Sequence, residues 1–363
     1  METRSCGDRL MCTVTLLLLC ACPPCCRASW MRLGLGPSGG PEDQDCAAPP
    51  LSPGQAALCR EKPFLLPGVR RGARLAIAEC QSQFKDERWN CSTREDASVF
   101  GTESNSGTKE TAFIHAMMAA GLVHGVTRSC SQGNMTECGC DTRLQGGGSP
   151  AEGWHWGGCS DHIQYGIWFS RKFIDSSVRN TSASGGYTLV AMNQHNSESG
   201  RQAVVRTMAT HCRCHGVSGS CGVKTCWKTV APLEQVGVYL KERYERSVQV
   251  WDRSRRKTRR KERRPPVEPH QLIFVNKSPN YCLEDRRWGV AGTRGRRCNR
   301  TSTGPDSCVL LCCGRGYNTH LNFCSNLMVL RTRVACHSCT FRVLMPRASR
   351  YNTTSGSTSK DCK

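Results

Sequence analysis

Cysteine is the residue type that most constrains this chain, because 27 of its 363 residues are cysteines. The chain is long enough to bury a core without so many cysteines. Dense cysteine usage implies disulfide bonds instead, and disulfide bonds persist in an oxidising compartment. With 38% hydrophobic residues, the rest of the composition is that of a globular protein. We therefore expect one large or two moderate domains that disulfide bonds hold together.

The N-terminus has the order of a secretory signal. Arg4 and Arg9 flank the start of an apolar run from Leu10 to Cys22, and the small residues Ala28 and Ser29 follow. This pattern predicts a signal peptide over residues 1–28 and a secreted protein. A membrane anchor is the alternative, but the run is short for a bilayer-spanning helix. Removal of the signal peptide takes away six of the 27 cysteines and leaves 21, an odd number that cannot all pair within one chain.

Positive charge is concentrated in one segment of a strongly basic chain. The formal net charge is +21, and nine of the twelve residues from Arg253 to Arg264 are Lys or Arg. A basic secreted protein meets sulfated glycans and acidic receptor surfaces rather than nucleic acid. Three interpretations of the run remain: a solvated linker, a loop that binds glycans or a receptor, or a nuclear localisation signal. A nuclear localisation signal would require that the predicted signal peptide does not direct the chain to secretion.

Apolar patterns predict a mainly helical first part of the chain. Apolar residues are nearly continuous between Gly107 and Cys130, which indicates a core helix, and Ser106, Thr108 and Glu110 indicate its capped start. We interpret His115 and His124 in this helix as core or core-edge residues and not as ligands. Further helices are predicted over residues 69–84, 163–174, 189–210 and 233–244.

The basic segment also marks the best domain boundary. The residues after it are rich in Cys, Gly and Arg and poor in apolar side chains, so that short β-hairpins held by disulfide bonds are expected there. The fold class is therefore disulfide-rich α+β. It consists of a large, mainly helical N-terminal domain (29–252), a basic linker (253–270) and a small cysteine-rich C-terminal domain of β-hairpins (271–363).

The sharpest local feature is a group of four cysteines at positions 212, 214, 221 and 226. A nested pairing of 212 with 226 and of 214 with 221 closes a two-rung hairpin with the tip His215 to Ser220. Gly216 and Gly219 permit positive φ angles in so tight a tip. Ser218 is then presented at the end of a rigid, projecting loop.

Three interpretations of this group compete. A zinc site needs four convergent ligands, and an oxidising compartment favours disulfides over thiolates. A serine nucleophile is suggested by residues 216–220, which nearly match G-x-S-x-G, but Ser220 replaces the last glycine and no strand–turn–helix context is present. The third interpretation, which we favour, is a structural hairpin whose Ser218 is a point of modification or docking.

The hairpin sequence resembles the hallmark of the Wnt ligands. Cys214-His-Gly-Val-Ser-Gly-Ser-Cys221 is followed by Lys224-Thr-Cys-Trp227, and the resemblance covers roughly Trp30 to His320. The other segments that carry it are Arg88-Trp-Asn-Cys91, Gly107-Thr-Lys-Glu-Thr-Ala-Phe113, Trp154-His-Trp-Gly-Gly-Cys159, Asn280-Tyr-Cys282 and Cys312-Cys-Gly-Arg-Gly-Tyr-Asn-Thr319.

The resemblance implies an acylated extracellular ligand and not an enzyme. The acyltransferase Porcupine would attach a cis-palmitoleoyl group to Ser218, the carrier Wntless would export the protein, and no cofactor or metal is implied beyond that covalent group. The partners would be Frizzled receptors, co-receptors related to the low-density-lipoprotein receptor and heparan sulfate proteoglycans of the extracellular matrix, with no nucleic acid. A second finger in the C-terminal domain would grip Frizzled from the opposite side. The hairpin residues that enter the groove of the Frizzled cysteine-rich domain would be Cys212, Cys214, His215, Gly216, Val217, Ser218, Gly219, Ser220, Cys221 and Cys226.

The resemblance also implies a set of disulfide bonds, which spacing alone would not fix. Cys46 and Cys59 are left over and could form one further pair. Six N-x-S/T sequons fit the secretory pathway, at Asn90, Asn134, Asn180, Asn276, Asn299 and Asn352. The pairs implied by the family are 80–91, 130–138, 140–159, 212–226, 214–221, 282–313, 298–308 and Cys312 with Cys362.

The tail departs from the family after His320. Residues 321–363 contain only Cys324, Cys336, Cys339 and Cys362, and no Trp follows Trp288. An altered reading frame, a splice variant, a gene-model error and real divergence all remain open, and the odd cysteine count fits a damaged tail. Cys336-His-Ser-Cys339 could be half of a zinc site, without an evident second half.

Three rival functions follow from these features. The first is a secreted heparin-binding or matrix protein without acylation, which the net charge of +21 favours. The second is a secreted hydrolase that uses Ser218. The third is a Wnt antagonist that engages Frizzled by the hairpin alone, if the tail is defective.

Overall fold

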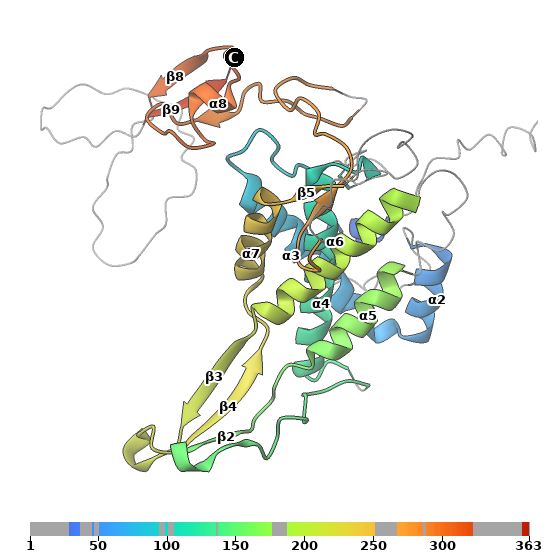
Figure 1. Cartoon of the computed structure of the whole chain (residues 1–363), viewed down its shortest axis with the longest axis vertical. Coiled ribbons are helices and arrows are strands. Elements are labelled where there is room, and N and C mark those ends of the chain that lie inside the picture. Colours follow the sequence, from blue (N-terminus) through green and yellow to red (C-terminus); the bar gives the residue numbers. More distant parts are fainter. Residues whose placement is uncertain are drawn as a thin grey trace, which may run out of the picture.

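The computed structural model of the chain (Figure 1) describes residues 29–36, 46, 51–93, 99–100, 105–135, 137–175, 187–250, 267–285, 288–321 and 358–362. The predicted signal peptide, the basic run 253–264 and most of the tail, with Cys324, Cys336 and Cys339, lie outside the described residues.

Helices dominate the first part of the chain, and short strands follow. The helices are η1 (Trp30–Gly34), α2 (Pro53–Glu61), η3 (Pro63–Leu65), α3 (Leu66–Phe84), α4 (Lys109–Ser131), η5 (Pro150–Glu152), α5 (Ile163–Asp175), α6 (Tyr187–Arg206), η6 (Val217–Gly219), α7 (Leu233–Glu245) and α8 (Cys308–Leu311). The strands are β1 (Gly148–Ser149), β2 (Trp154–Trp156), β3 (Ala209–Cys214), β4 (Lys224–Thr229), β5 (Val248–Gln249), β6 (Ile273–Phe274), β7 (Arg297–Cys298), β8 (Tyr317–Leu321) and β9 (Thr358–Cys362).

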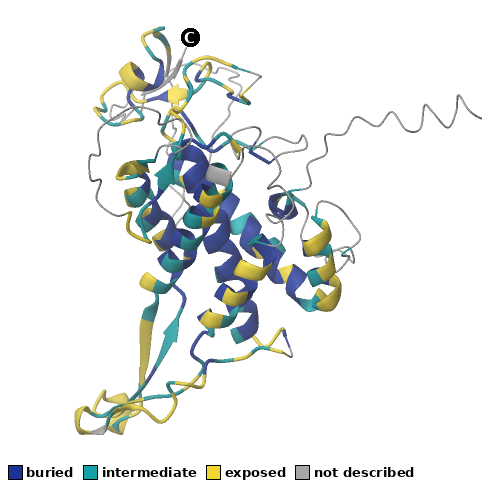
Figure 2. Ribbon diagram, turned by 45° about the vertical axis from the view of Figure 1, so that its right-hand side comes forward, coloured by how far each residue is buried: buried dark blue, intermediate teal, exposed yellow. Residues whose placement is uncertain are grey.

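Helix α4 is the centre of the helical domain, and Figure 2 shows it buried along most of its length. Its first turn is closed by a reciprocal cap. The Thr108 hydroxyl accepts from the backbone N–H of Thr111 at 3.3 Å, and the Thr111 hydroxyl accepts from that of Thr108 at 3.2 Å. His115 and His124 are half-buried. The predicted capped core helix with core-edge histidines is confirmed.

Helices α3 and α6 pack closely against α4 because glycines stand at the crossings. A Cβ atom on Gly72 of α3 would lie 2.3 Å from the carbonyl oxygen of Gly121. A Cβ atom on Gly200 of α6 would lie 1.9 Å from that of Ala116. Only a residue without Cβ permits such an approach of two backbones.

The helix predicted over 189–210 is wrong at its C-terminal end. Helix α6 ends at Arg206, and Ala209 and Thr210 begin strand β3 instead. These two residues pair with Thr229 and Lys228 of β4, so that a long-range sheet replaces the helical hydrogen bonds. The predictions over 69–84, 163–174 and 233–244 are confirmed by α3, α5 and α7.

The first residues after the predicted linker lie against the helical domain. Strand β6 pairs in parallel with β5, and the side chain of Asn196 on α6 holds Ile273 through two hydrogen bonds of 2.9 Å, one to its carbonyl oxygen and one from its N–H. The start of the segment that we assigned to the C-terminal domain therefore packs against the helical domain.

The cysteine-rich part of the chain forms a small C-terminal module at the opposite end of the molecule from strands β3 and β4 (Figure 1). Its sheet has the strand order β7-β9-β8. Its core consists of Cys298, Cys308, Leu311 and Cys312. The expected short strands are present, together with the one-turn helix α8, which we did not predict. The disulfide-rich α+β class is confirmed.

Arg296 attaches this module to the end of α3. Its guanidinium group donates to the carbonyl oxygens of Lys85 at 2.8 Å, Glu87 at 2.5 Å and Arg88 at 2.9 Å. In return, Nε of Arg88 donates to the carbonyl oxygen of Leu310 in α8 at 2.9 Å. A cation at the C-terminus of a helix satisfies its last carbonyl groups and its dipole.

Candidate functional site

Strands β3 and β4 form the hairpin that the four clustered cysteines predicted. They pair in an antiparallel register that places Cys212 opposite Cys226 and Cys214 opposite Lys224. The structure joins Cys212 to Cys226 and Cys214 to Cys221 by disulfide bonds. Figure 1 shows the hairpin projecting from one end of the helical domain, and Figure 2 shows that its outer half is largely exposed.

Strand β2 widens the outer half of the hairpin, next to the tip, into a sheet of four strands. It runs parallel to β4 in the order β1-β2-β4-β3 and places Trp154 beside Lys224 and Trp156 beside Cys226. Sequence reasoning used residues 154–159 only as a family motif and missed this strand. The alternation of two tryptophans with His155 was the available signal.

The tip is a compact turn held by its own backbone. The N–H of His215 donates to the carbonyl oxygen of Val223 at 2.7 Å, that of Gly216 donates to Ser220 at 2.8 Å, and that of Gly219 donates to Gly216 at 2.8 Å. Ser218 and Ser220 are exposed, as is Val217 with 89% of its surface. These hydrogen bonds, in and beside the loop that Cys214 and Cys221 close, fix the backbone of the tip while its side chains face solvent.

One of the two tip glycines has a different role from the one predicted. Gly219 has φ +77°, as expected, but Gly216 has φ −65°, so the prediction of a positive φ there is wrong. Glycine is needed at 216 for space, because a Cβ atom would lie 2.5 Å from the carbonyl oxygen of Ser220. Ser218 itself takes the left-handed conformation, with φ 55°.

Asp161 fixes the base of the hairpin to α4. This buried carboxylate accepts a hydrogen bond from the N–H of Val230 at 2.7 Å, directly after β4, and another from the hydroxyl of Ser131 at the end of α4. Arg128 of α4 lies 3.5 Å from the same carboxylate. The direction in which the hairpin projects is thus set by a buried, fully engaged anion.

A cavity of about 370 Å³ lies beside this base, lined by the side chains of Leu144, Ile163, Val205, Met208 and others. At its edge, Asp141 is bonded to Arg143 by two hydrogen bonds of 2.8 and 2.5 Å. This hydrogen-bonded pairing lowers the pKa of Asp141 to about 2. Asp161 and Lys228 also line the cavity, so it combines an apolar wall with charged groups at its rim.

The geometry argues against Ser218 as a nucleophile. A triad serine needs a base within hydrogen-bond reach. Ser218 stands on a solvent-exposed tip, and within the described part of the chain its hydroxyl forms no hydrogen bond with a histidine. The strand–turn–helix of a nucleophile elbow is also replaced here by a strand–turn–strand.

All the other predicted cysteine pairs except Cys312 with Cys362, which no described bond tests, are brought together as well. The structure contains the disulfide bonds Cys46–Cys59, Cys80–Cys91, Cys130–Cys138, Cys140–Cys159, Cys282–Cys313 and Cys298–Cys308. Cys312 is also disulfide-bonded. Its predicted partner Cys362 lies in β9 opposite Tyr317, with a side chain outside the described part of the molecule.

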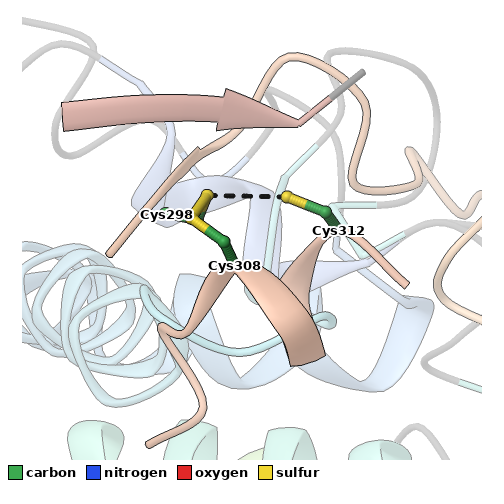
Figure 3. A group of neighbouring side chains, drawn as sticks. All are labelled: Cys298, Cys308 and Cys312. Atoms are coloured by element: carbon green, nitrogen blue, oxygen red, sulfur yellow. Dashed lines mark hydrogen bonds between the residues drawn. A yellow bond between two sulfur atoms is a disulfide. The ribbon is translucent and has the colours of Figure 1, made fainter. Parts of the chain in front are cut away.

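Three sulfur atoms in the C-terminal module come close enough to suggest a metal site (Figure 3). Cys298 and Cys308 are bonded to each other, and the Sγ atom of Cys312 lies 3.5 Å from that of Cys298. Metal ions bind thiolates, whereas all three of these cysteines are in disulfides. The cluster is therefore a disulfide core.

The sequons lie on several faces of the molecule. Asn134, Asn276 and Asn299 are exposed and Asn90 is half-buried, while Asn180 and Asn352 lie outside the described residues. The side-chain oxygen of Asn299 accepts hydrogen bonds from the backbone and the hydroxyl of Thr301, each at 3.0 Å.

The disulfide framework and the projecting hairpin define the class of a secreted, disulfide-rich ligand. Comparisons with known proteins agree. The sequence model of the Wnt family matches residues 47–346, which includes part of the tail beyond His320. Protein Wnt-16 of Mus musculus is 57% identical over 321 residues, which are 86% of this chain and 88% of that protein. Protein Wnt-16 of Bos taurus is 57% identical over 323 residues, 87% of this chain and 89% of that protein.

A solved structure is similar as well. The complex of human WLS with WNT8A contains a chain with a TM-score of 0.57 and 29% identity, over 92% of this chain and 100% of that chain.

The chain belongs to the Wnt family and is Wnt-16-like. It is accordingly a Wnt signalling ligand and not an enzyme. In the described part of the molecule, every helix is too short or too polar to cross a membrane.

Proposed function

We propose that this ligand carries a cis-palmitoleoyl group on Ser218 and binds Frizzled receptors by placing the acylated hairpin tip in the groove of their cysteine-rich domain. The observation that supports the proposal is the exposed serine on a tip braced by two disulfides and turned outward by its left-handed backbone. An acyltransferase can reach such a hydroxyl without unfolding the protein, and no buried partner competes for it.

The energetics favour a lipid as the main anchor of the complex. Sixteen carbons buried in an apolar groove contribute on the order of 10 kcal/mol, at about 0.8 kcal/mol for each CH₂, before the costs of association. The hairpin tip offers few apolar side chains of its own. Because its backbone is already fixed by two disulfides, little conformational entropy is lost on docking.

The acyl group also predicts a carrier. A free acyl chain is poorly compatible with water, so a carrier must accompany the ligand, and a Wnt ligand is found with WLS in a solved structure similar to this chain. We propose that Porcupine is the acyltransferase and Wntless the carrier. We also propose that the co-receptors are receptors related to the low-density-lipoprotein receptor and that heparan sulfate proteoglycans are the matrix partners.

Ser218→Ala tests the proposal directly. Cells fed an alkynyl fatty acid should label the wild-type chain and the variant Ser220→Ala, a serine two positions away on the same exposed tip, but not Ser218→Ala. Binding of the purified chains to a Frizzled cysteine-rich domain should fall at least a hundredfold for Ser218→Ala alone. Undiminished label or binding in Ser218→Ala would refute the proposal.

A matrix-binding protein without acylation is the second candidate, supported by the net charge of +21. It predicts secreted material without an acyl group on Ser218 that is retained by heparin. Mass spectrometry of the peptide that contains Ser218 separates the two candidates.

A further inference from the structure

Apolar side chains are exposed at the far end of the hairpin. Val217 is 89% exposed and Val223 is 50% exposed, on either side of the turn. Single exposed apolar residues are ordinary on protein surfaces. These two, however, lie on the part of the molecule that projects farthest from its helical domain (Figure 1). They can therefore meet another surface before the rest of the protein does.

An aromatic side chain lies beside the same tip. Trp154 is the β2 neighbour of Lys224 and is half-buried, with its ring 5.3 Å from that of Trp156 in an edge-to-face pair. Its indole N–H donates to the carboxylate of Glu152 at 2.9 Å. Partly exposed tryptophans are enriched where protein meets the headgroup region of a membrane.

Positive charge surrounds these apolar groups. The hairpin from Ala209 to Thr229 contains Arg213, Lys224 and Lys228 and no Asp or Glu. Arg213 and Lys224 lie in the two rows of the sheet nearest the tip. Neither is in a salt bridge with a described residue. Among the hydrogen bonds of the described residues, the carboxylate of Glu152 accepts only the neutral indole N–H of Trp154, so it keeps its negative charge and offsets part of this positive charge.

We propose that the hairpin tip is a membrane-contacting element that docks end-on at surfaces of anionic phospholipid. Val217 and Val223 enter the interface, Trp154 lies at the headgroups, and Arg213 and Lys224 face the lipid phosphates. The interaction belongs to the polypeptide and exists without an acyl group, so it goes beyond the proposed function. A single acyl chain gives only marginal membrane binding, and a cationic patch is one kind of second signal that makes it stable.

Charge alone would equally suit a sulfated glycan, but a glycan makes no use of exposed valines. The combination of apolar, aromatic and cationic side chains on one projecting tip is what favours the membrane.

The end-on geometry makes a specific distinction between two lysines of β4. Lys224 and Lys228 are four residues apart and therefore point to the same face of the strand, about 14 Å from each other along it. Electrostatic attraction to a membrane is screened over about 8 Å at physiological ionic strength. Lys224 should therefore contribute to binding and Lys228 should not.

The test uses the full-length chain with Ser218→Ala, so that no acyl group is attached. Co-sedimentation with vesicles of phosphatidylcholine alone, and of phosphatidylcholine mixed with phosphatidylserine, gives the partition coefficient. On the mixed vesicles we expect about a fivefold loss for each of Arg213→Gln and Lys224→Gln, and also for Val217→Thr, which places a hydroxyl group in the interface. Lys228→Gln should change it less than twofold. All proteins compared carry glutamine in place of the nine Lys and Arg residues of the basic run 253–264, because that run could bind the mixed vesicles by itself and hide a loss at the tip.

Equal losses for Lys224→Gln and Lys228→Gln would overturn the end-on arrangement. Equal binding to both kinds of vesicle would overturn the role of charge. A lack of effect of Val217→Thr, combined with weaker retention of the lysine variants on heparin, would assign the patch to glycans instead. Only variants with the same thermal midpoint as the parent protein are compared, so that misfolding is excluded. Because the protein in this test is unacylated, its outcome is separate from that of the labelling experiment on Ser218.

Discussion

Three described residues other than glycine have a left-handed backbone conformation. Each of them either forms a disulfide bond or lies in a loop that a disulfide bond closes. Their φ angles are 53° at Cys91, 55° at Ser218 and 54° at Cys313. This conformation costs an ordinary residue about 1–2 kcal/mol. Cys91 and Cys313 are themselves crosslinked, and Ser218 lies within the loop closed by Cys214 and Cys221. The crosslinks thus hold backbone conformations that the side chains alone would not favour.

His124 is a residue whose protonation the fold opposes. Burial, and secondly the nearby cation Arg128, lower its pKa to about 4 from the usual 6.5. Its folded-state pKa is below the unfolded one, so the unfolded chain takes up a proton first as the pH falls, and stability decreases from about pH 6.5 downward. Between pH 7.5 and 5 this residue alone should remove about 2 kcal/mol of the free energy of unfolding. Denaturant unfolding across this pH range measures it.

His124→Gln provides the comparison, since glutamine does not titrate. The variant should lose less stability than the wild type over the same range, by about 2 kcal/mol, whatever its stability at pH 7.5. Parallel pH profiles for the two proteins would show that His124 is protonated equally in both states.

At the residue scale, the exposed serine could be predicted and its backbone could not. The spacing of four cysteines was enough to place Ser218 at a tip. The prediction of a positive φ at Gly216 was wrong because a Gly-x-x-Gly tip can form turns that differ in which residues are left-handed. Which residues turn left-handed depends on how Gly216 and Ser220 meet across the turn, which no local preference encodes.

At the scale of elements, the contact between α4 and α6 depends on the missing side chain of Gly200. Gly200→Ala would place a Cβ atom 1.9 Å from the carbonyl oxygen of Ala116, so the two helices must separate. Overpacking of this kind costs about 1–3 kcal/mol, which exceeds the gain of about 1 kcal/mol in helix propensity at the upper end. We expect a lower thermal midpoint, by about 2–4 °C for each kcal/mol of net loss.

Gly139→Ala is the matched control, because Gly139 has open space where its Cβ atom would lie and is not among the residues with positive φ. Its free energy of unfolding should stay within about 0.5 kcal/mol of that of the wild type. A Gly200→Ala protein as stable as this control would mean that α6 shifts freely on α4.

A helix or strand could be predicted where the residues that stabilise it lie close together in the sequence. The apolar run of α4 and the cap at Thr108 lie within one stretch of sequence, and both were predicted. The end of α6 was not, because Ala209 and Thr210 find their partners in β4, beyond the hairpin tip. Strand β2 is three residues long and is formed by its pairing with β1 and β4, so its own pattern is weak.

At the scale of the whole molecule, Arg296 links the C-terminal module to the helical domain. Arg296→Ala would leave the carbonyl oxygens of Lys85, Glu87 and Arg88 without this donor. A hydrogen bond from a charged group contributes about 1.5–3 kcal/mol where it is shielded from solvent, and each of these three contributes less, because two of them are exposed and one is partly buried. We expect amide hydrogen exchange to become at least tenfold faster in residues 282–313 of the module and at the end of α3. Exchange at the centre of α4 should stay unchanged.

Arg297→Ala removes the same charge from the next position, which is exposed on β7. Its exchange pattern should match that of the wild type. If both variants exchange alike, the disulfides of the module and the packing around them hold it in place without help from Arg296.

The described crosslinks have one further consequence for biosynthesis. The residues that they join are between 7 and 31 positions apart. At a synthesis rate of about 5–20 residues per second, both partners of even the widest bond enter the lumen within roughly 2 to 6 seconds of each other. The arrival of the second cysteine is therefore not what limits these bonds, because no described bond has to wait for a distant part of the polypeptide, and the rate of oxidation itself sets when each short loop closes.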